Sequence, residues 1–221
     1  NSLLSFVKIP YVVTVYDLIH EKTNSHQKEF KKKKILENAR HIICISNNTK
    51  KDLIKIYKIN PKKISVIYLG AERKKIKFIK KKENFILYVG NRSKYKNFKS
   101  FIEAFSKSTY LKKNYEVVCF GGENFNNEEI KFFDKIKVKK KIKYLKGSDQ
   151  DLENLYKKAS LFVSLSIYEG FGLTLLEAMK FKCPVVCSDI AVFREIYKDG
   201  CKYVNSTKIS SIKSGIENVL K

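Results

Sequence analysis

The chain has 221 residues, 43% hydrophobic and 31% charged, which indicates one large or two small folded domains and argues against disorder. No apolar run approaches the roughly 20 residues that a membrane-spanning helix needs. The formal charge is +24, but only four of the 46 basic residues are arginine and the lysines are dispersed along the chain, which is not the pattern of a protein that reads base sequences.

Short apolar runs alternate with helical patterns, as in a parallel sheet that helices cover on both faces. In the first part of the chain, Ser46 or Asn47 is the expected N-cap of the second helix. The lysine-rich segment 71–83 shows no clear period and is expected to be a linker. The expected elements before it are strands at 11–15, 41–46 and 64–69, and helices at 26–38 and 49–57.

A second, longer series of strand–helix units follows the linker and predicts a doubly wound sheet. The sequence therefore predicts an α/β protein with two Rossmann-like doubly wound domains, at 1–70 and 84–221, of which the first is incomplete. The expected strands of the second domain are 85–90, 115–120, 142–145, 161–165 and 184–187, and its expected helices are 97–107, 126–136, 150–158, 172–180 and 192–197.

The cysteines are scattered, and most lie in apolar runs, so we expect reduced thiols in the core of a cytoplasmic protein. Cys183 and Cys187 are four residues apart, but no histidine or second cysteine pair accompanies them. The sequence therefore predicts no metal site.

The most informative stretch, YEGFGLTLLEAM, begins at Tyr168 and runs into the expected helix 172–180. It follows the carboxyl end of an expected strand, where α/β folds bind ligands. Gly170 and Gly172 flank Phe171 and allow a ligand to approach the backbone closely. The free N–H groups at the start of the helix favour an anion.

Two carboxylates belong to this stretch. Glu169 lies in the loop, and Glu177 falls five residues after Gly172, about 8 Å along the helix axis. At those positions the pair can hold two parts of an extended, hydroxyl-rich ligand. The other interpretation is a helix-cap glutamate and a core glutamate, and the spacing alone does not decide between them.

A second stretch, GNRSKYKN at 90–97, also follows a strand directly. Fixed cations at such a place stabilise a phosphate group whose negative charge grows during a reaction. Arg92 offers a fork to phosphate oxygens and Lys96 a point charge. On their own, these residues are more typical of a solvated turn than of a phosphate site.

The spacing of Glu169 and Glu177 resembles the E-x7-E motif of retaining GT-B glycosyltransferases of family 4. The neighbouring blocks are similar too, and the resemblance covers nearly all of 85–205 and, more weakly, 11–70. The matching blocks are LYKKA at 155–159, FVSLS at 162–166, YEGFGL, LEAM, CPVV at 183–186, VTVYDL at 13–18, and Ile45-Ser46.

The resemblance implies a role for each motif. Glu169 would lie beside the transferred sugar as a catalytic residue, and Glu177 would bind the ribose hydroxyls. Arg92 and Lys96 would hold the pyrophosphate. The backbone that would hold donor hydroxyls and phosphate is Gly170, Phe171, Gly172 and Leu173.

The first domain departs from the family pattern. Relatives often carry a histidine, placed near the reacting sugar, where this chain has Tyr16. The nearest histidine is His20, which becomes the candidate catalytic group of that domain, with a plain loop residue as the alternative.

The resemblance therefore implies a GT-B glycosyltransferase that lacks the start of its first domain and the last helix of its second. It would move a sugar, with retention, from a nucleoside-diphosphate sugar such as GDP-mannose to a glycan or lipid-linked acceptor in surface polysaccharide synthesis. It would use no metal or other cofactor. We expect a cytoplasmic protein in peripheral contact with the anionic inner membrane face, and no specific nucleic-acid partner. The alternatives are a GT-B epimerase or phosphorylase and a basic nucleic-acid-binding module.

Overall fold

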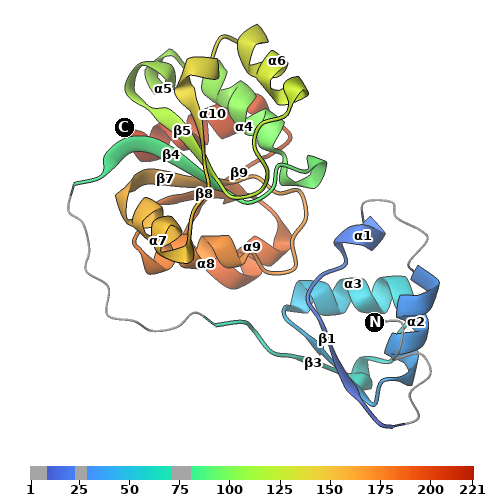
Figure 1. Cartoon of the computed structure of the whole chain (residues 1–221). Coiled ribbons are helices and arrows are strands. Elements are labelled where there is room, and N and C mark those ends of the chain that lie inside the picture. The colour runs from blue at the N-terminus through green and yellow to red at the C-terminus, as the bar shows by residue number, and fades with distance from the viewer. Residues whose placement is uncertain (1–8, 23–28, 71–80) are drawn as a thin grey trace. The chain divides into compact units, whose positions relative to one another are not determined.

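The computed structural model describes residues 9–22, 29–70 and 81–221 (Figure 1). The chain divides into two compact units. The first contains Asn1–Gly70 with the segments Tyr168–Gly172 and Ile190–Ile196, and the second contains the remainder. Most of the expected linker, residues 71–80, lies outside the described residues, as does the start of the expected helix 26–38. The expected domain boundaries stay a prediction.

The first unit is built on a parallel sheet of order β1-β2-β3. Apolar side chains from its strands and helices, among them Leu18, Ile42 and Leu53, form one buried cluster. The elements are β1 (Val12–Val15), α1 (Ile19–Lys22), α2 (Glu29–Asn38), β2 (His41–Cys44), α3 (Asn47–Tyr57), the 3-10 turn η3 (Pro61–Lys63) and β3 (Ile64–Val66).

Helix α3 begins at Asn47, two residues before the start expected from the sequence, and its N-cap is one of the two expected residues. The side chain of Ser46 accepts a hydrogen bond from the Thr49 backbone N–H at 3.0 Å, which makes Ser46 the N-cap. The helix ends at Lys58, which has a left-handed backbone and donates its N–H to the Ile54 carbonyl.

The second unit contains a parallel sheet of order β6-β5-β4-β7-β8-β9. The central strands are buried on both faces, as a parallel sheet covered by helices requires. The strands are β4 (Glu83–Val89), β5 (Glu116–Phe120), β6 (Ile142–Leu145), β7 (Ala159–Ser164), β8 (Val185–Ser188) and β9 (Lys202–Val204).

Helices cover both faces of this sheet. In Figure 1, α4, α5, α6 and α10 lie on one face, and α7 and α8 lie on the other. The strand order and the two helical layers confirm the predicted Rossmann-like α/β class. The helices and turns are η4 (Lys94–Lys96), α4 (Phe98–Ser106), α5 (Thr109–Asn114), α6 (Asn127–Lys135), η5 (Lys139–Lys141), α7 (Asp149–Lys158), α8 (Leu173–Lys180), α9 (Ala191–Tyr197) and α10 (Ile209–Leu220).

Strand β9 and helix α10 were not expected from the sequence. Strand β9 has three residues, too few for a clear alternation of apolar and polar side chains. Helix α10 contains Gly215, which sequence rules read as unfavourable in a helix. Here the glycine is required by packing, because a Cβ on Gly215 would lie 2.2 Å from a methyl carbon of Val204 in β9.

The cysteines behave as expected from their positions in apolar runs. All five are free thiols, and Cys44, Cys119, Cys183 and Cys187 are buried. None of the helices in the described residues is long and apolar enough to cross a membrane.

Candidate functional site

The strand order of the second unit marks one place on the sheet. Strands β4, β5 and β6 run outward in one direction and β7, β8 and β9 in the other, so the winding reverses between β4 and β7. In open α/β sheets, ligands bind at the carboxyl ends of the strands beside such a switch point. The loops after β4 and β7 contain the two motifs singled out in the sequence, one beginning at Gly90 and the other at Tyr168.

The loop after β4 is anchored within the second unit. The Ile167 N–H, in the loop after β7, donates to the Tyr95 carbonyl at 2.8 Å. The Asn97 side-chain amide donates to the Ser206 carbonyl at 2.8 Å. Lys96 lies in the turn η4, and its Nζ is 5.2 Å from the centre of the Tyr95 ring. These bonds fix the residues on both sides of Lys96, and its contact with a phosphate stays a prediction.

Arg92 belongs to the same loop, but its guanidinium is bound by protein groups. Its Nε donates to Oε1 of Glu129 at 2.6 Å, and its Nη2 donates to the Glu123 carbonyl at 2.6 Å. Only 6% of the Arg92 side chain is exposed. The structure thus places Arg92 among the residues that follow β5, and its predicted contact with a pyrophosphate stays a prediction.

Helix α8 carries Glu177 on its inner side. The hydroxyl of Tyr156, in α7, lies 3.1 Å from Oε2 of Glu177 and 3.2 Å from the Thr174 carbonyl. Tyr156 is fully buried, with its ring 5.6 Å from that of Phe162 and 6.0 Å from that of Phe181. The Glu177 carboxylate is therefore positioned by a rigid neighbour.

The environment of Glu177 makes its carboxyl group harder to ionise than one in water. Burial raises the pKa of the Glu177 carboxyl, and the negative charge of Asp149 adds to the rise. The hydrogen bond with Tyr156 and the charge of Lys180 act in the opposite direction. A half-buried carboxylate at this depth on the helix is suited to accept hydrogen bonds from hydroxyl groups of a ligand.

The segment Tyr168–Gly172 precedes α8. Gly170 and Phe171 are buried, Glu169 is half-buried, and Leu173, the first helical residue, is 46% exposed. Gly172 has φ of +93°, and a Cβ there would lie 2.5 Å from Cε1 of Phe193. Position 172 therefore requires glycine for two reasons: its backbone angle is unfavourable for other residues, and there is no room for a Cβ atom. The roles assigned to Glu169, Gly170, Phe171, Gly172 and Leu173 stay predictions.

The predicted group of the first unit, His20, lies on the short helix α1. Its side chain is exposed, and Tyr16 is 58% exposed. Asp17, between them, accepts a hydrogen bond from the Ile19 N–H at 3.0 Å and so begins α1. The catalytic role of His20 stays a prediction.

Two buried hydroxyl groups at the carboxyl ends of strands were not predicted from the sequence. Ser166 follows β7 and Ser188 ends β8, and both Oγ atoms are buried without a hydrogen-bond partner within the described structure. Buried polar atoms normally find a partner, which can be water or a ligand. A single serine in a sequence gives no sign that its hydroxyl will be buried without a partner. Among the described residues, no three His, Cys, Asp or Glu side chains are grouped as metal ligands would be.

Comparison with known protein families shows to which family the chain belongs. The family described as "Glycosyl transferases group 1" matches residues 70–221, and "Glycosyltransferase Family 4" matches residues 2–75. The chain belongs to the group 1 glycosyltransferases. The resemblance stated from the sequence motifs is thus confirmed.

Two curated relatives of this group 1 glycosyltransferase chain are named as glycosyltransferases. It is 32% identical over 185 residues to the O-antigen chain mannosyltransferase RfbU of Salmonella typhimurium, covering 83% of this chain and 52% of RfbU. It is 29% identical over 153 residues to a Campylobacter jejuni α-N-acetylgalactosaminyltransferase that acts on a diphospho-undecaprenol-linked sugar, covering 67% and 41%. The chain thus spans about half the length of these relatives.

A solved structure supports the fold. The sucrose-phosphate synthase of Thermosynechococcus elongatus aligns with a TM-score of 0.79 at 18% identity, over 99% of this chain and 60% of that one. Together with the two parallel sheets, this likeness confirms the GT-B fold class.

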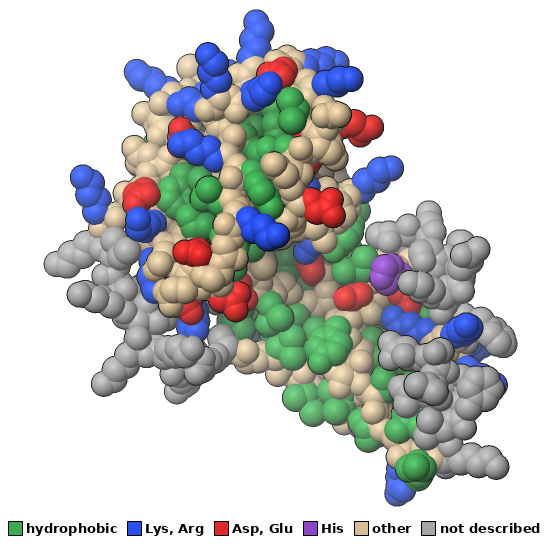
Figure 2. Space-filling model, viewed as in Figure 1, with side chains coloured by type: hydrophobic (Ala, Val, Ile, Leu, Met, Phe, Trp, Pro, Cys, Tyr) green, Lys and Arg blue, Asp and Glu red, His purple; other side chains and the backbone are tan. Residues whose placement is uncertain are grey.

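The basic residues of the group 1 glycosyltransferase chain are spread over the surface. Figure 2 shows Lys and Arg side chains at separate points of the second unit, with Asp and Glu between them, on the face that it displays. The side chains coloured there do not form a continuous basic groove on that face, such as a nucleic-acid backbone would occupy.

Proposed function

We propose that the protein transfers a sugar from a nucleoside-diphosphate sugar to a glycan or lipid-linked acceptor. The observation that carries the proposal is the strand order of the second unit, which puts the loops after β4 and β7 on either side of the switch point. Those loops carry the cationic motif and the glutamate motif that resemble the donor-binding motifs of family 4.

The donor would be held by its charged and hydroxyl groups. Lys96, with the N–H groups that open α8, would bind the diphosphate. Glu177, whose carboxylate Tyr156 positions, would bind the ribose hydroxyls. The backbone of 170–173 would hold the hydroxyls of the sugar.

The reaction breaks the bond between the anomeric carbon and the diphosphate oxygen, which keeps the electron pair. The acceptor hydroxyl forms the new bond to the anomeric carbon and gives its proton to the departing diphosphate oxygen. Positive charge develops on the sugar ring, as in glycoside hydrolysis, and the carboxylate of Glu169 would stabilise it. Retention of the anomeric configuration is supported by the family resemblance.

The similarity to the O-antigen mannosyltransferase RfbU supports mannose, donated by GDP-mannose, as the sugar transferred in surface polysaccharide synthesis. We place the reaction at the cytoplasmic face of a membrane, where the basic surface would be attracted to anionic lipids and to a lipid-linked acceptor. No step requires a divalent metal or another cofactor.

The test is an assay of the protein with GDP-mannose, UDP-galactose and UDP-N-acetylgalactosamine, each with diphospho-undecaprenol-linked acceptors. The expected result is transfer from one donor, undiminished by EDTA, with the product anomer matching the donor anomer. Cleavage by inorganic phosphate would instead indicate a phosphorylase, and epimerised donor an epimerase. Tight, salt-sensitive binding to a DNA duplex without any transfer would indicate a nucleic-acid-binding module.

A further inference from the structure

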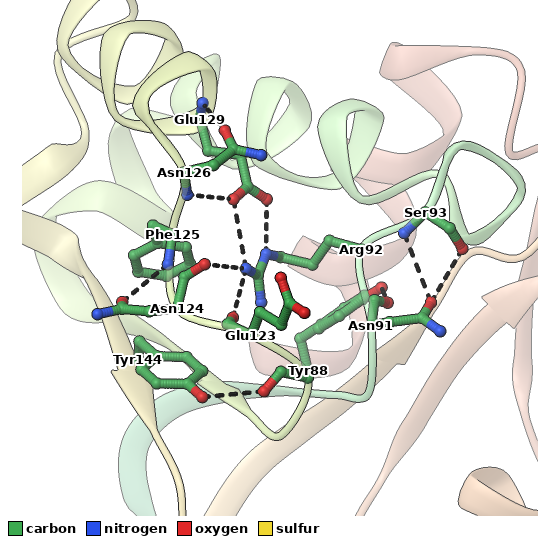
Figure 3. Close-up of polar contacts among 11 residues, drawn as sticks. Tyr88, Asn91, Arg92, Ser93, Glu123, Asn124, Phe125, Asn126, Glu129 and Tyr144 are labelled. Atoms are coloured by element: carbon green, nitrogen blue, oxygen red, sulfur yellow. Dashed lines mark hydrogen bonds and ion pairs between the residues drawn. The ribbon is translucent and has the colours of Figure 1, made fainter.

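Arg92 makes a dense set of contacts with the segment between β5 and α6 (Figure 3). Its Nε and Nη2 bind the two oxygens of Glu129, at 2.6 and 3.3 Å. Its Nη2 also donates to the carbonyls of Glu123 and Asn124, at 2.6 and 3.0 Å. Only a forked, planar group can reach a carboxylate and two carbonyls together. The remaining nitrogen, Nη1, is buried without a hydrogen-bond partner within the described structure.

Aromatic rings line the guanidinium. Its carbon lies 4.9 Å from the ring centre of Phe125, in the loop after β5, and 5.8 Å from that of Phe98, in the first turn of α4. Both distances suit cation–π attraction, which is stronger when the charge is out of water. Arg92 is therefore held by groups from two successive strand–helix connections.

Glu129 is shared between Arg92 and the start of α6. Its Oε2 accepts the Asn126 N–H at 2.9 Å, and the Asn126 side chain accepts the Glu129 N–H at 2.9 Å, which is a capping box. The same carboxylate thus fixes the first turn of α6 and binds the loop after β4 through Arg92.

The two loops also touch through their backbones. Gly122 has φ of +69°, and a Cβ there would lie 3.0 Å from the Gly90 carbonyl oxygen and 3.1 Å from the Asn91 Cα. The hydroxyl of Tyr144 donates to the Gly122 carbonyl at 3.0 Å, and that of Tyr88 donates to the Asn91 carbonyl at 2.7 Å (Figure 3). Tyrosine side chains thus hold a carbonyl of each loop.

We propose that Arg92 is a positioning residue: through Glu129 and two loop carbonyls it fixes the segment Gly121–Asn126 as a wall of the donor site. It acts on the ligand through this segment and not by contact with phosphate. The inference rests on the proposed function, because the wall follows β5, the strand that pairs with β4 on the side away from β7. Protein acceptors already bind two of the three guanidinium nitrogens, Nε and Nη2, and the third, Nη1, is buried.

The first test measures hydrogen–deuterium exchange in the ligand-free protein, which does not depend on any assumed substrate. The variants are Arg92→Lys, which keeps the charge without the fork, and Glu129→Gln, which keeps the shape of the carboxylate. The control is Lys139→Met, which removes an exposed ion pair with Asp134 beyond the far end of α6.

Peptides that cover 121–126 are expected to exchange roughly tenfold faster in Arg92→Lys and Glu129→Gln, since the loop opens locally when its side-chain contacts are lost. Peptides of β7 and β8, and the whole of Lys139→Met, should exchange as in the unmodified protein. Unchanged exchange at 121–126 in both variants would overturn the proposal. Faster exchange throughout would do so too, because Arg92 would then support the fold in general.

The second test measures the dissociation constants of UDP and GDP. We expect Arg92→Lys and Glu129→Gln each to weaken binding of the preferred nucleotide by roughly tenfold, as misplacement of a site wall does. The double variant should be no weaker than either single variant, because the pair acts as one unit. In the transfer assay, donor KM should rise while kcat stays within about twofold.

A direct phosphate contact would give a different result. Arg92→Lys would weaken binding, while Glu129→Gln would leave it unchanged or strengthen it, because the guanidinium would be released. That pattern would overturn the positioning role. If the unmodified protein bound neither nucleotide, the proposed function would fail, while exchange at 121–126 would still decide whether Arg92 holds the loop.

Discussion

The Tyr156 hydroxyl lies 3.1 Å from Oε2 of Glu177 and 3.2 Å from the Thr174 carbonyl, so one O–H group serves two acceptors. When Glu177 is ionised, the hydroxyl can donate to the carboxylate. When Glu177 is protonated, the carboxyl can donate to Tyr156, which then donates to Thr174. The Tyr156 hydroxyl can thus hold the Glu177 side chain in place in either protonation state.

Tyr156→Phe should raise the donor KM by about tenfold with little change in kcat, because one hydrogen bond to a charged group is lost while the ring packing stays. Steady-state kinetics with varied donor would measure it. Tyr110→Phe is the control. The Tyr110 hydroxyl, in α5, donates to the Leu220 carbonyl in α10, on the face of the sheet opposite α7 and α8. Equal donor KM values for the unmodified protein and both variants would show that Tyr156 does not position Glu177 for donor binding.

Glu177→Gln should raise the melting temperature at pH 7 while weakening donor binding. Burial raises the pKa of Glu177 in the folded state, so folding is favoured by its protonated form. That stabilisation is complete below the ordinary carboxyl pKa and is lost as the pH rises through the raised value. Glutamine keeps the uncharged form at every pH.

The check is a series of thermal melts between about pH 4 and pH 8, a range that starts near the ordinary carboxyl pKa and extends well above it. The difference between Glu177→Gln and the unmodified protein should be a few degrees at neutral pH and should vanish towards the acid end. A variant that is less stable at pH 7 would argue against a raised pKa.

Gly172→Ala should destabilise the protein by about 1–3 kcal/mol, because alanine is strained at this backbone angle. Its methyl group would also meet the buried ring of Phe193. Urea unfolding would measure the loss. Gly70→Ala is the matched control, since it has no positive φ and open space around it, and it should be neutral within about 0.5 kcal/mol. Equal stability of the two variants would contradict the structural requirement at 172.

The sequence predicted the strand–helix alternation well because burial on both faces leaves continuous apolar runs such as that of β4. It also gave Ser46 as one of two candidate caps, because capping is a local effect. It missed β9, whose three residues are defined by pairing with β8. For the candidate site, the sequence motifs identified the two loops, but they did not reveal which side chains the motif residues contact. Arg92 meets Glu129, 37 positions away, and Tyr156 meets Glu177, and no local pattern encodes such long-range pairs.

The two glutamates should differ in their kinetic effects. Glu169→Gln should chiefly lower kcat, by about tenfold or more, because positive charge develops near it only in the transition state. Glu177→Gln should chiefly raise the donor KM, because ribose binding is made equally in ground and transition states. Kinetics at saturating donor would separate the two effects. The reverse pattern would exchange the two assigned roles.

Calorimetric titration of the protein with UDP, GDP and their sugars tests most directly whether the switch point holds a nucleoside-diphosphate sugar. We predict that one nucleotide binds with a single site per chain. Lys96→Met should weaken it by about tenfold or more, as expected for loss of a phosphate-binding cation, while the surface variant Lys139→Met binds as the unmodified protein does. Absence of binding by every nucleotide, or equal affinity in Lys96→Met, would contradict the account.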